Sequence, residues 1–348
     1  MSEQEERVWT GARELNAIIS GSGTIYEDVA LRQYVQDVMD RLYPDFKGRI
    51  HVTLLKSPEL NAFAVPDGHI YVNIGLLARL QTEAQLATVL AHEGVHFTHR
   101  HGLQGQKSLK DNTALATFVS SLGIPILGDL VAISSIFGFS REMETEADRV
   151  GYQQLMRAGY DVREAPAAFK HLMDEVKAED IKEPYFFSSH PKLKERFDNM
   201  TRLSAGAGSD GTGNSRTEYS RVVLKARIDT LEAMLSMGRA KAALVALEGA
   251  QRVEALPTFG QYYFGEAYRL RDEPGDQERA EAAYSAAIAA APEFAPSYRA
   301  LGVLRYKGGN FTEAAHYLER YLEMAPDARD RKYIEKYLRT ARERGERP

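Results

Sequence analysis

The last third of the chain repeats itself with a period of about 34 residues, and this period restricts the possible folds more than any other feature of the sequence. Pro257, Pro292 and Pro326 recur at intervals of 35 and 34 residues. Small residues recur at corresponding places in the copies: Ala267 and Gly302, then Ala280 and Ala314. Small side chains let paired helices approach closely, so we predict a stack of helical hairpins.

These copies resemble tetratricopeptide repeats, which consist of two antiparallel helices each. The best copies cover residues 263–292 and 298–326, and a more divergent copy covers 228–250. We expect three repeats, followed by a terminal capping helix near 327–343. The resemblance implies that this region binds protein partners.

Residues 204–215 are twelve consecutive small or polar residues without apolar periodicity. Such a composition is typical of a flexible linker. We therefore predict an N-terminal domain over 1–203, a linker over 204–215 and a repeat domain over 216–348.

The N-terminal part predicts an α+β domain that is predominantly helical. Segments 49–58 and 69–77 are rich in β-branched residues, and a short strand between them ends in a Pro-Asp-Gly turn. We expect these strands to form a small antiparallel sheet. Apolar residues at helical spacing predict four helices: 26–42, 82–101, 142–158 and 162–178.

The net charge and the absence of cysteine bear on two classes of site, nucleic-acid interfaces and metal centres. The net charge of −5 gives no support for nucleic-acid binding. The chain contains no cysteine, so a metal would be held by histidine and carboxylate side chains.

Four of the nine histidines lie within residues 92–101. His92 and His96 are one helical turn apart and Glu93 lies beside them, which gives the pattern His-Glu-x-x-His. In this pattern the histidines bind zinc and the glutamate acts as a general base. The alternative is that both histidines are ordinary core or surface groups.

A third ligand would distinguish a metal site from this alternative. The helix over 140–156 carries Glu144 and Asp148 one turn apart on one face. A carboxylate from this helix could complete a His₂Glu site with an open position for water. Asp148 could hold a ligating histidine in the required tautomer.

Four motifs occur in an order that resembles the HtpX-like and BepA-like zinc metallopeptidases, gluzincins related to the CAAX prenyl proteases. They are NAFAVPDGHIYVNIGLL, LAHEGVHFTHRH, SREMETEADRVG and SSHPKLKER. The resemblance covers roughly residues 5–203 and implies a zincin-type fold. The repeats behind it resemble the BepA-like branch.

The resemblance assigns roles that spacing leaves open. It implies one Zn²⁺ per chain, with Glu144 rather than Glu142 or Glu146 as the third ligand. It also implies that His190 and Arg196 face the metal. We assign no role to His99 and His101, which we expect to be structural residues near the end of a helix.

A zinc peptidase with these residues would use Glu93 to take a proton from the attacking water. Arg196 or His190 would stabilise the oxyanion. We expect an extended substrate to add as a strand to an exposed edge beside the metal. The residues of that edge are Asn61, Ala62, Phe63 and Ala64.

Residues 113–139 contain a single charged residue, Asp129. Glycines and a proline break the segment into pieces shorter than a membrane span, so we expect a buried helical hairpin. A lid over the metal, or a surface for peripheral contact with a membrane or partner, is the alternative.

Two functions remain open. The first is a zinc endopeptidase of envelope or outer-membrane protein quality control, which cleaves unfolded or misassembled proteins that the repeats dock. The second is a repeat-based adaptor or chaperone with a latent metal site. The first twenty residues hold no secretory signal. The resemblance nevertheless implies a periplasmic protein whose signal is trimmed; the alternative is cytoplasmic.

Overall fold

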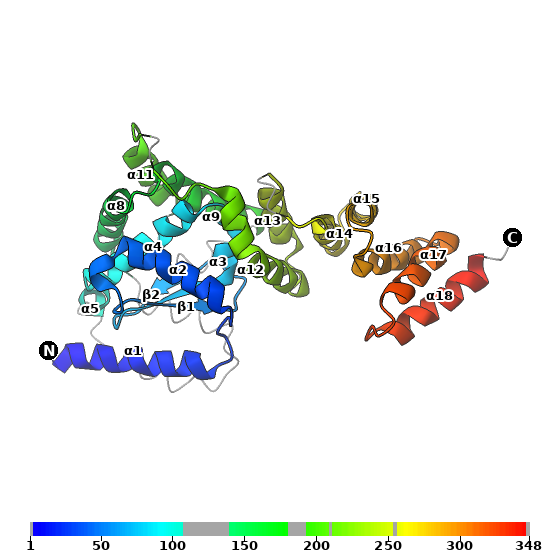
Figure 1. The fold of residues 1–348 in the computed structure, drawn as a ribbon, viewed down its shortest axis with the longest axis horizontal. Coiled ribbons are helices and arrows are strands. Elements are labelled where there is room, and N and C mark those ends of the chain that lie inside the picture. Colours follow the sequence, from blue (N-terminus) through cyan, green and yellow to red (C-terminus); the bar gives the residue numbers. More distant parts are fainter. Residues whose placement is uncertain (1–2, 107–138, 180–192, 209–210, 253–255, 346–348) are drawn as a thin grey trace. The chain divides into compact units, whose positions relative to one another are not determined.

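The computed structural model describes residues 3–106, 139–179, 193–208, 211–252 and 256–345. The chain forms two compact units, unit 1 over Met1–Ala233 and unit 2 over Met234–Pro348 (Figure 1). Over these residues the fold is mostly helical with one small sheet, which confirms the predicted class.

The described residues of unit 1 contain three short strands in the order β1-β3-β2. Strands β2 (Ala62–Ala64) and β3 (His69–Asn73) form an antiparallel hairpin. Strand β1 (His51–Leu55) pairs with β3 in parallel, with His51 opposite His69. The sheet is therefore mixed, and the prediction of an antiparallel sheet was wrong. After β1 the chain leaves one strand position free and forms β2. Strand β3 then occupies this position between β1 and β2.

Helices cover both faces of this sheet (Figure 1). One face packs against α2 (Val29–Leu42) and α4 (Glu83–Thr98) through side chains that include Val52, Leu54 and Ile70. The other face packs against α1 (Glu3–Gly21). The apolar positions of α1 lie at helical spacing and meet alternate strand residues: Ala12, Leu15 and Ile19 against Leu55, Phe63 and Tyr71.

Among the remaining helices of unit 1, α5, α8 and α9 pack against α4. The structure gives their bounds, together with two short 3₁₀ turns, as follows: η1 Pro44–Phe46, α3 Ile74–Arg79, α5 His101–Gln106, α8 Arg141–Arg157, η2 Val162–Glu164, α9 Ala165–Glu179, α11 Leu193–Ser204 and α12 Arg216–Ser236. The four predicted helices correspond to α2, α4, α8 and α9.

The boundary between the units lies after residue 233, whereas we expected it at 204–215. Described residues of that segment bond to unit 1: the Gly213 carbonyl accepts from Ala84 N–H and the Thr212 carbonyl accepts from Asp161 N–H. Helix α12 also packs on unit 1, because the Tyr219 hydroxyl donates to the Leu77 carbonyl at 3.0 Å. These contacts account for the later boundary.

Unit 2 consists of helices stacked in pairs. Their bounds are α13 Ala240–Arg252, α14 Gly260–Arg271, α15 Asp276–Ala290, α16 Ala295–Lys307, α17 Phe311–Met324 and α18 Arg331–Gly345. Ala267, Ala280 and Ala314 are fully buried, as expected of small residues between paired helices. The predicted capping helix corresponds to α18.

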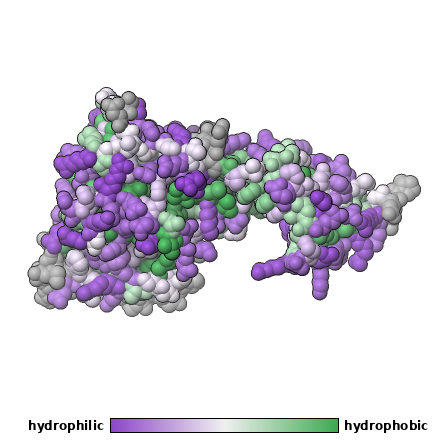
Figure 2. All heavy atoms as spheres, in the orientation of Figure 1, coloured by the Kyte–Doolittle hydropathy of each residue, from purple (hydrophilic) through white to green (hydrophobic). Residues whose placement is uncertain are grey.

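The visible surface of both units is largely hydrophilic (Figure 2). None of the described helices combines the length and the apolar composition that crossing a bilayer requires.

Candidate metal centre

Helix α4 carries His92 and His96 and is buried within unit 1. It begins at Thr82, whose hydroxyl accepts from the N–H of Gln85 and so satisfies one of the free donors of the first turn. All of its residues from Ala84 to His96 are buried. His92 and His96 are 1% and 2% exposed, so they are not a solvated helix face.

Helix α8 brings the carboxylates to α4. The Ser140 side chain caps its first turn, and Glu144 and Asp148 follow one turn apart. A Cβ atom at Gly151 would lie 3.2 Å from the backbone nitrogen of His92. The glycine thus allows the two helices to approach closely enough for carboxylates to reach the histidines.

Three ligand atoms converge between the helices. The Nε2 atoms of His92 and His96 are 3.0 Å apart, and each lies 3.5 Å from an oxygen of Glu144. Tetrahedral zinc with bonds of 2.0–2.1 Å needs ligand atoms about 3.3 Å apart. Both the donor set and the spacing of this buried cluster therefore fit a zinc ion.

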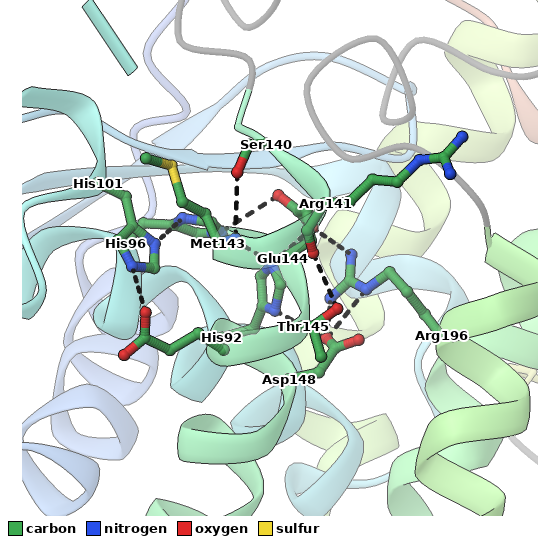
Figure 3. A network of polar contacts seen from close by, with 11 residues as sticks. His92, His96, His101, Ser140, Arg141, Met143, Glu144, Thr145, Asp148 and Arg196 are labelled. Atoms are coloured by element: carbon green, nitrogen blue, oxygen red, sulfur yellow. Dashed lines mark hydrogen bonds and ion pairs between the residues drawn. The ribbon is translucent and has the colours of Figure 1, made fainter. Parts of the chain in front are cut away.

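Asp148 and Arg196 flank the cluster on the His92 side (Figure 3). The Asp148 carboxylate lies 3.0 Å from His92 Nδ1, and Arg196 Nη2 lies 2.9 Å from the same carboxylate. Although burial opposes ionisation, the Arg196 guanidinium and His92 hold the pKa of Asp148 below its usual range. Arg196 Nη1 also lies 3.9 Å from Glu144. The structure thus brings Arg196 of α11 to the cluster.

His101 and Phe139 lie against His96, and Figure 3 shows His101 beside it. His101 Nδ1 is 3.0 Å from His96 Nδ1, and the Phe139 ring stacks on the His96 ring with centroids 3.6 Å apart. His101 is fully buried, and burial lowers its pKa. We had expected His101 to be a structural residue of a helix end. The only signal in the sequence was its place five residues after His96.

Glu93 lies between the metal cluster and strand β2. It is fully buried, and burial raises the pKa of its carboxyl to about 7. His92 and Arg196 oppose this shift, Glu144 adds to it, and the Ala64 N–H donates a hydrogen bond that lowers the pKa. A carboxyl with a pKa close to neutrality can both accept and return a proton at neutral pH.

Strand β2 is the last strand of its sheet but is not exposed. Asn61, Ala62, Phe63 and Ala64 are between 0% and 4% exposed. The expectation of an exposed edge was therefore wrong. Ala62 and Ala64 belong to the core shared with α4, while Phe63 belongs to the core shared with α1.

Two predictions fall outside the described residues. His190 lies within 180–192, and residues 113–138 of the apolar segment lie within 107–138. At the end of that segment, Phe139 is described and contacts His96.

Comparison with known proteins follows the same division of the chain. Residues 27–204 match peptidase family M48, and residues 272–339 match the tetratricopeptide repeat. The chain is 29% identical over 195 residues to the beta-barrel assembly-enhancing protease of Escherichia coli K12, which covers 51% of this chain and 40% of the relative.

Two further relatives are mitochondrial metalloendopeptidases. The chain is 32% identical over 172 residues to the mitochondrial metalloendopeptidase OMA1 of Schizosaccharomyces pombe, covering 47% of this chain and 50% of the relative. The match to OMA1 of Arabidopsis thaliana is 36% over 149 residues, with 42% of this chain and 30% of the relative covered. The chain thus spans half the length of these relatives or less. The family match takes in just over half of the 348 residues and contains the buried His92–His96–Glu144 cluster. The chain therefore belongs to peptidase family M48, the metallopeptidases, and carries tetratricopeptide repeats at its C-terminus.

Proposed function

We propose that this chain is a zinc-dependent endopeptidase that cleaves unfolded or misassembled polypeptides. The observation that carries the proposal is the buried cluster of His92, His96 and Glu144, with ligand atoms 3.0–3.5 Å apart and Glu93 beside it. A solvated or purely structural pair of histidines would not need a buried carboxylate facing both Nε2 atoms.

His92, His96 and Glu144 would hold the ion, which supplies Lewis acidity when bound. Glu93 would take a proton from the water that attacks the peptide carbonyl and return it to the leaving amine. Arg196 is a candidate for stabilising negative charge on the carbonyl oxygen. Its bonds to Asp148 hold the guanidinium in place at the cluster.

The register of β2 indicates how a substrate strand would bind. The Asn61 carbonyl accepts from Asn73 N–H, and Val65 N–H donates to the His69 carbonyl, so these residues pair with β3. Because backbone groups alternate in direction, those of Ala62 and Ala64 point to the outer edge, where Ala64 N–H reaches Glu93. We propose that an extended substrate bonds to Ala62 and Ala64 once this buried edge opens.

The relatives support a role in protein quality control, since one is named a beta-barrel assembly-enhancing protease. We propose that this chain acts on envelope or outer-membrane proteins, that it is periplasmic, and that its repeats dock the substrate or an assembly partner. An unfolded chain fits this site better than a folded domain, because a strand must enter a buried edge.

Proteolysis of an unfolded protein tests the proposal. Purified wild-type protein should cleave casein, a chelator should abolish the cleavage, and zinc should restore it. Glu93→Gln should keep the zinc and lower the rate by at least about 10²-fold, because the general base is lost. Cleavage that persists in the chelator, or in Glu93→Gln, would refute the mechanism.

A further inference from the structure

We propose that His101 and Glu146 form a positioning relay that fixes the proton on His96 and so orients this imidazole for the metal. The inference rests on the metal centre of the proposed function. It assigns a role to two residues, on α5 and α8, that neither bind the ion nor touch the substrate.

The relay begins at the nitrogen of His96 that faces away from the cluster. His96 Nε2 lies 3.0 Å from His92 Nε2, so Nε2 is the ligand atom, and Nδ1 lies 3.0 Å from His101 Nδ1. Two imidazole nitrogens form a hydrogen bond when one carries a proton and the other does not. A neutral His96 that binds a metal through Nε2 carries its proton on Nδ1. His96 is therefore the donor, and His101 Nδ1 is the acceptor.

This assignment fixes the next step. A neutral His101 that accepts at Nδ1 carries its proton on Nε2, and this atom lies 3.3 Å from Glu146 Oε2. The other oxygen of Glu146 lies 2.9 Å from His99 Nδ1. The direction of each bond thus leads from the metal ligand to the Glu146 carboxylate. The His92 imidazole contacts the Asp148 carboxylate directly. The His96 imidazole, in contrast, is connected to the Glu146 carboxylate through the imidazole of His101.

A strained turn places His101 in this position. Helix α4 ends at Thr98, and Arg100 follows with φ of +58°, a left-handed conformation that non-glycine residues rarely adopt. Such a conformation is unfavourable for a residue with a side chain and persists when its surroundings require it. The turn folds the chain back, so that His101 lies fully buried against His96 only five residues later.

The same side chains could instead hold a second metal, because ligand atoms of His99, His101 and Glu146 lie within 4.8 Å of one another. A metal on His101 Nε2 would move its proton to Nδ1. That proton would then face the Nδ1 proton of His96, and the two donors would repel. Metal binding at His96 therefore favours the relay over a second metal.

Metal affinity of the full-length protein tests the relay. We would measure the zinc dissociation constant by competition with a chromogenic chelator, and the absorption spectrum after cobalt substitution. His101→Leu should weaken zinc binding by about 10–100-fold and shift the cobalt bands, as loss of a group behind a ligating histidine does. His101→Asn should recover most of the affinity, because its amide oxygen can accept from His96 Nδ1.

Two further variants separate the relay from general destabilisation. Glu146→Gln should weaken zinc binding by a smaller factor, since the acceptor remains and the charge is lost. Glu142→Gln, an exposed glutamate on the same helix, should leave the dissociation constant unchanged. The free energies of unfolding of the metal-free variants should not rank in the same order as their affinities for zinc.

The outcomes distinguish the two proposals. If Glu144→Ala loses the metal but His101→Leu keeps the wild-type affinity and cobalt spectrum, the relay is refuted and the metal centre stands. Two zinc ions per chain, one of them lost in His99→Ala, would replace the relay by a second metal site. Wild-type protein that binds no zinc would overturn the relay and the proposed function together.

Discussion

Replacing Glu93 by glutamine should stabilise the metal-free protein, although it removes the proposed general base. Burial raises the pKa of Glu93 from 4.5 to about 7. In the unfolded chain this carboxyl ionises near its ordinary pKa, so between these two values the folded protein retains a proton that the unfolded chain has lost. The contribution of Glu93 to the free energy of unfolding therefore falls as the pH rises from about 4.5 to about 7, and it levels off above pH 7.

The size of the effect follows from the shift. Each pKa unit corresponds to 1.36 kcal/mol, so ionised Glu93 costs the folded state about 3 kcal/mol at neutral pH. The residue is fully buried, so solvent does not screen this cost. Glutamine has nearly the same shape and does not titrate. The stability advantage of Glu93→Gln should thus grow by about 3 kcal/mol between pH ~4.5 and pH ~8.

Urea unfolding with zinc removed by a chelator measures this difference. The chain has one tryptophan, Trp9, which lies on α1, so its fluorescence follows the unfolding of unit 1. Glu27→Gln, an exposed residue of the same unit, is the control and should show no such trend. A difference between wild type and Glu93→Gln that does not change with pH would refute the reasoning. Added zinc should reduce the advantage, because the cation favours ionised Glu93.

Three other predictions concern the third metal ligand, His190 and the packing at Gly94. Purified protein should contain about one zinc per chain and Glu144→Ala should lose most of it, so full zinc content in that variant by elemental analysis would move the third ligand elsewhere. His190→Ala should raise basal cleavage of casein if His190 occupies the open metal position at rest; lower activity at unchanged zinc content would instead favour an oxyanion role, worth about 10²-fold. Gly94→Ala should destabilise unit 1 by about 1–3 kcal/mol in urea unfolding, because its Cβ would lie 2.2 Å from the buried ring of Tyr43. Gly21→Ala, with no atom near its Cβ, is the control and should show no loss.

The helical parts of the molecule could be predicted because their periodicity is local. His92 and His96 share a helix, so their spacing alone places both imidazoles on one face. The pairing of β1 with β3 was missed because strands of three to five residues carry no signal for their neighbours. The contacts of residues 204–215 could not be predicted for a similar reason: composition marks these residues as small and polar, but does not show what they bond to.

Prediction of the metal centre was likewise limited to what local spacing shows. Glu144 and Asp148 could be proposed from spacing, whereas Arg196 was reached only through resemblance, because a single arginine on a helix usually lies in solvent. The contact of His101 with His96 could not be predicted, because it depends on the left-handed turn at Arg100, and arginine is not a residue that predicts such a turn. The buried state of β2 also depends on long-range packing that no local pattern encodes.

Helix α12 limits how this peptidase could be recombined with other repeat arrays during evolution. Tyr219 bonds to the Leu77 carbonyl, and Arg227 donates to the carbonyls of Ala78 and Leu80, directly before α4 begins. Tyr219 and its neighbours one and two turns on also belong to the main core of unit 1. A gene fusion made within residues 204–215 would uncover that core, whereas one made after residue 233 would keep it closed. The glycine-rich segment therefore looks like a junction in the sequence, but the contacts of Tyr219 and Arg227 continue unit 1 beyond it, as far as Ala233.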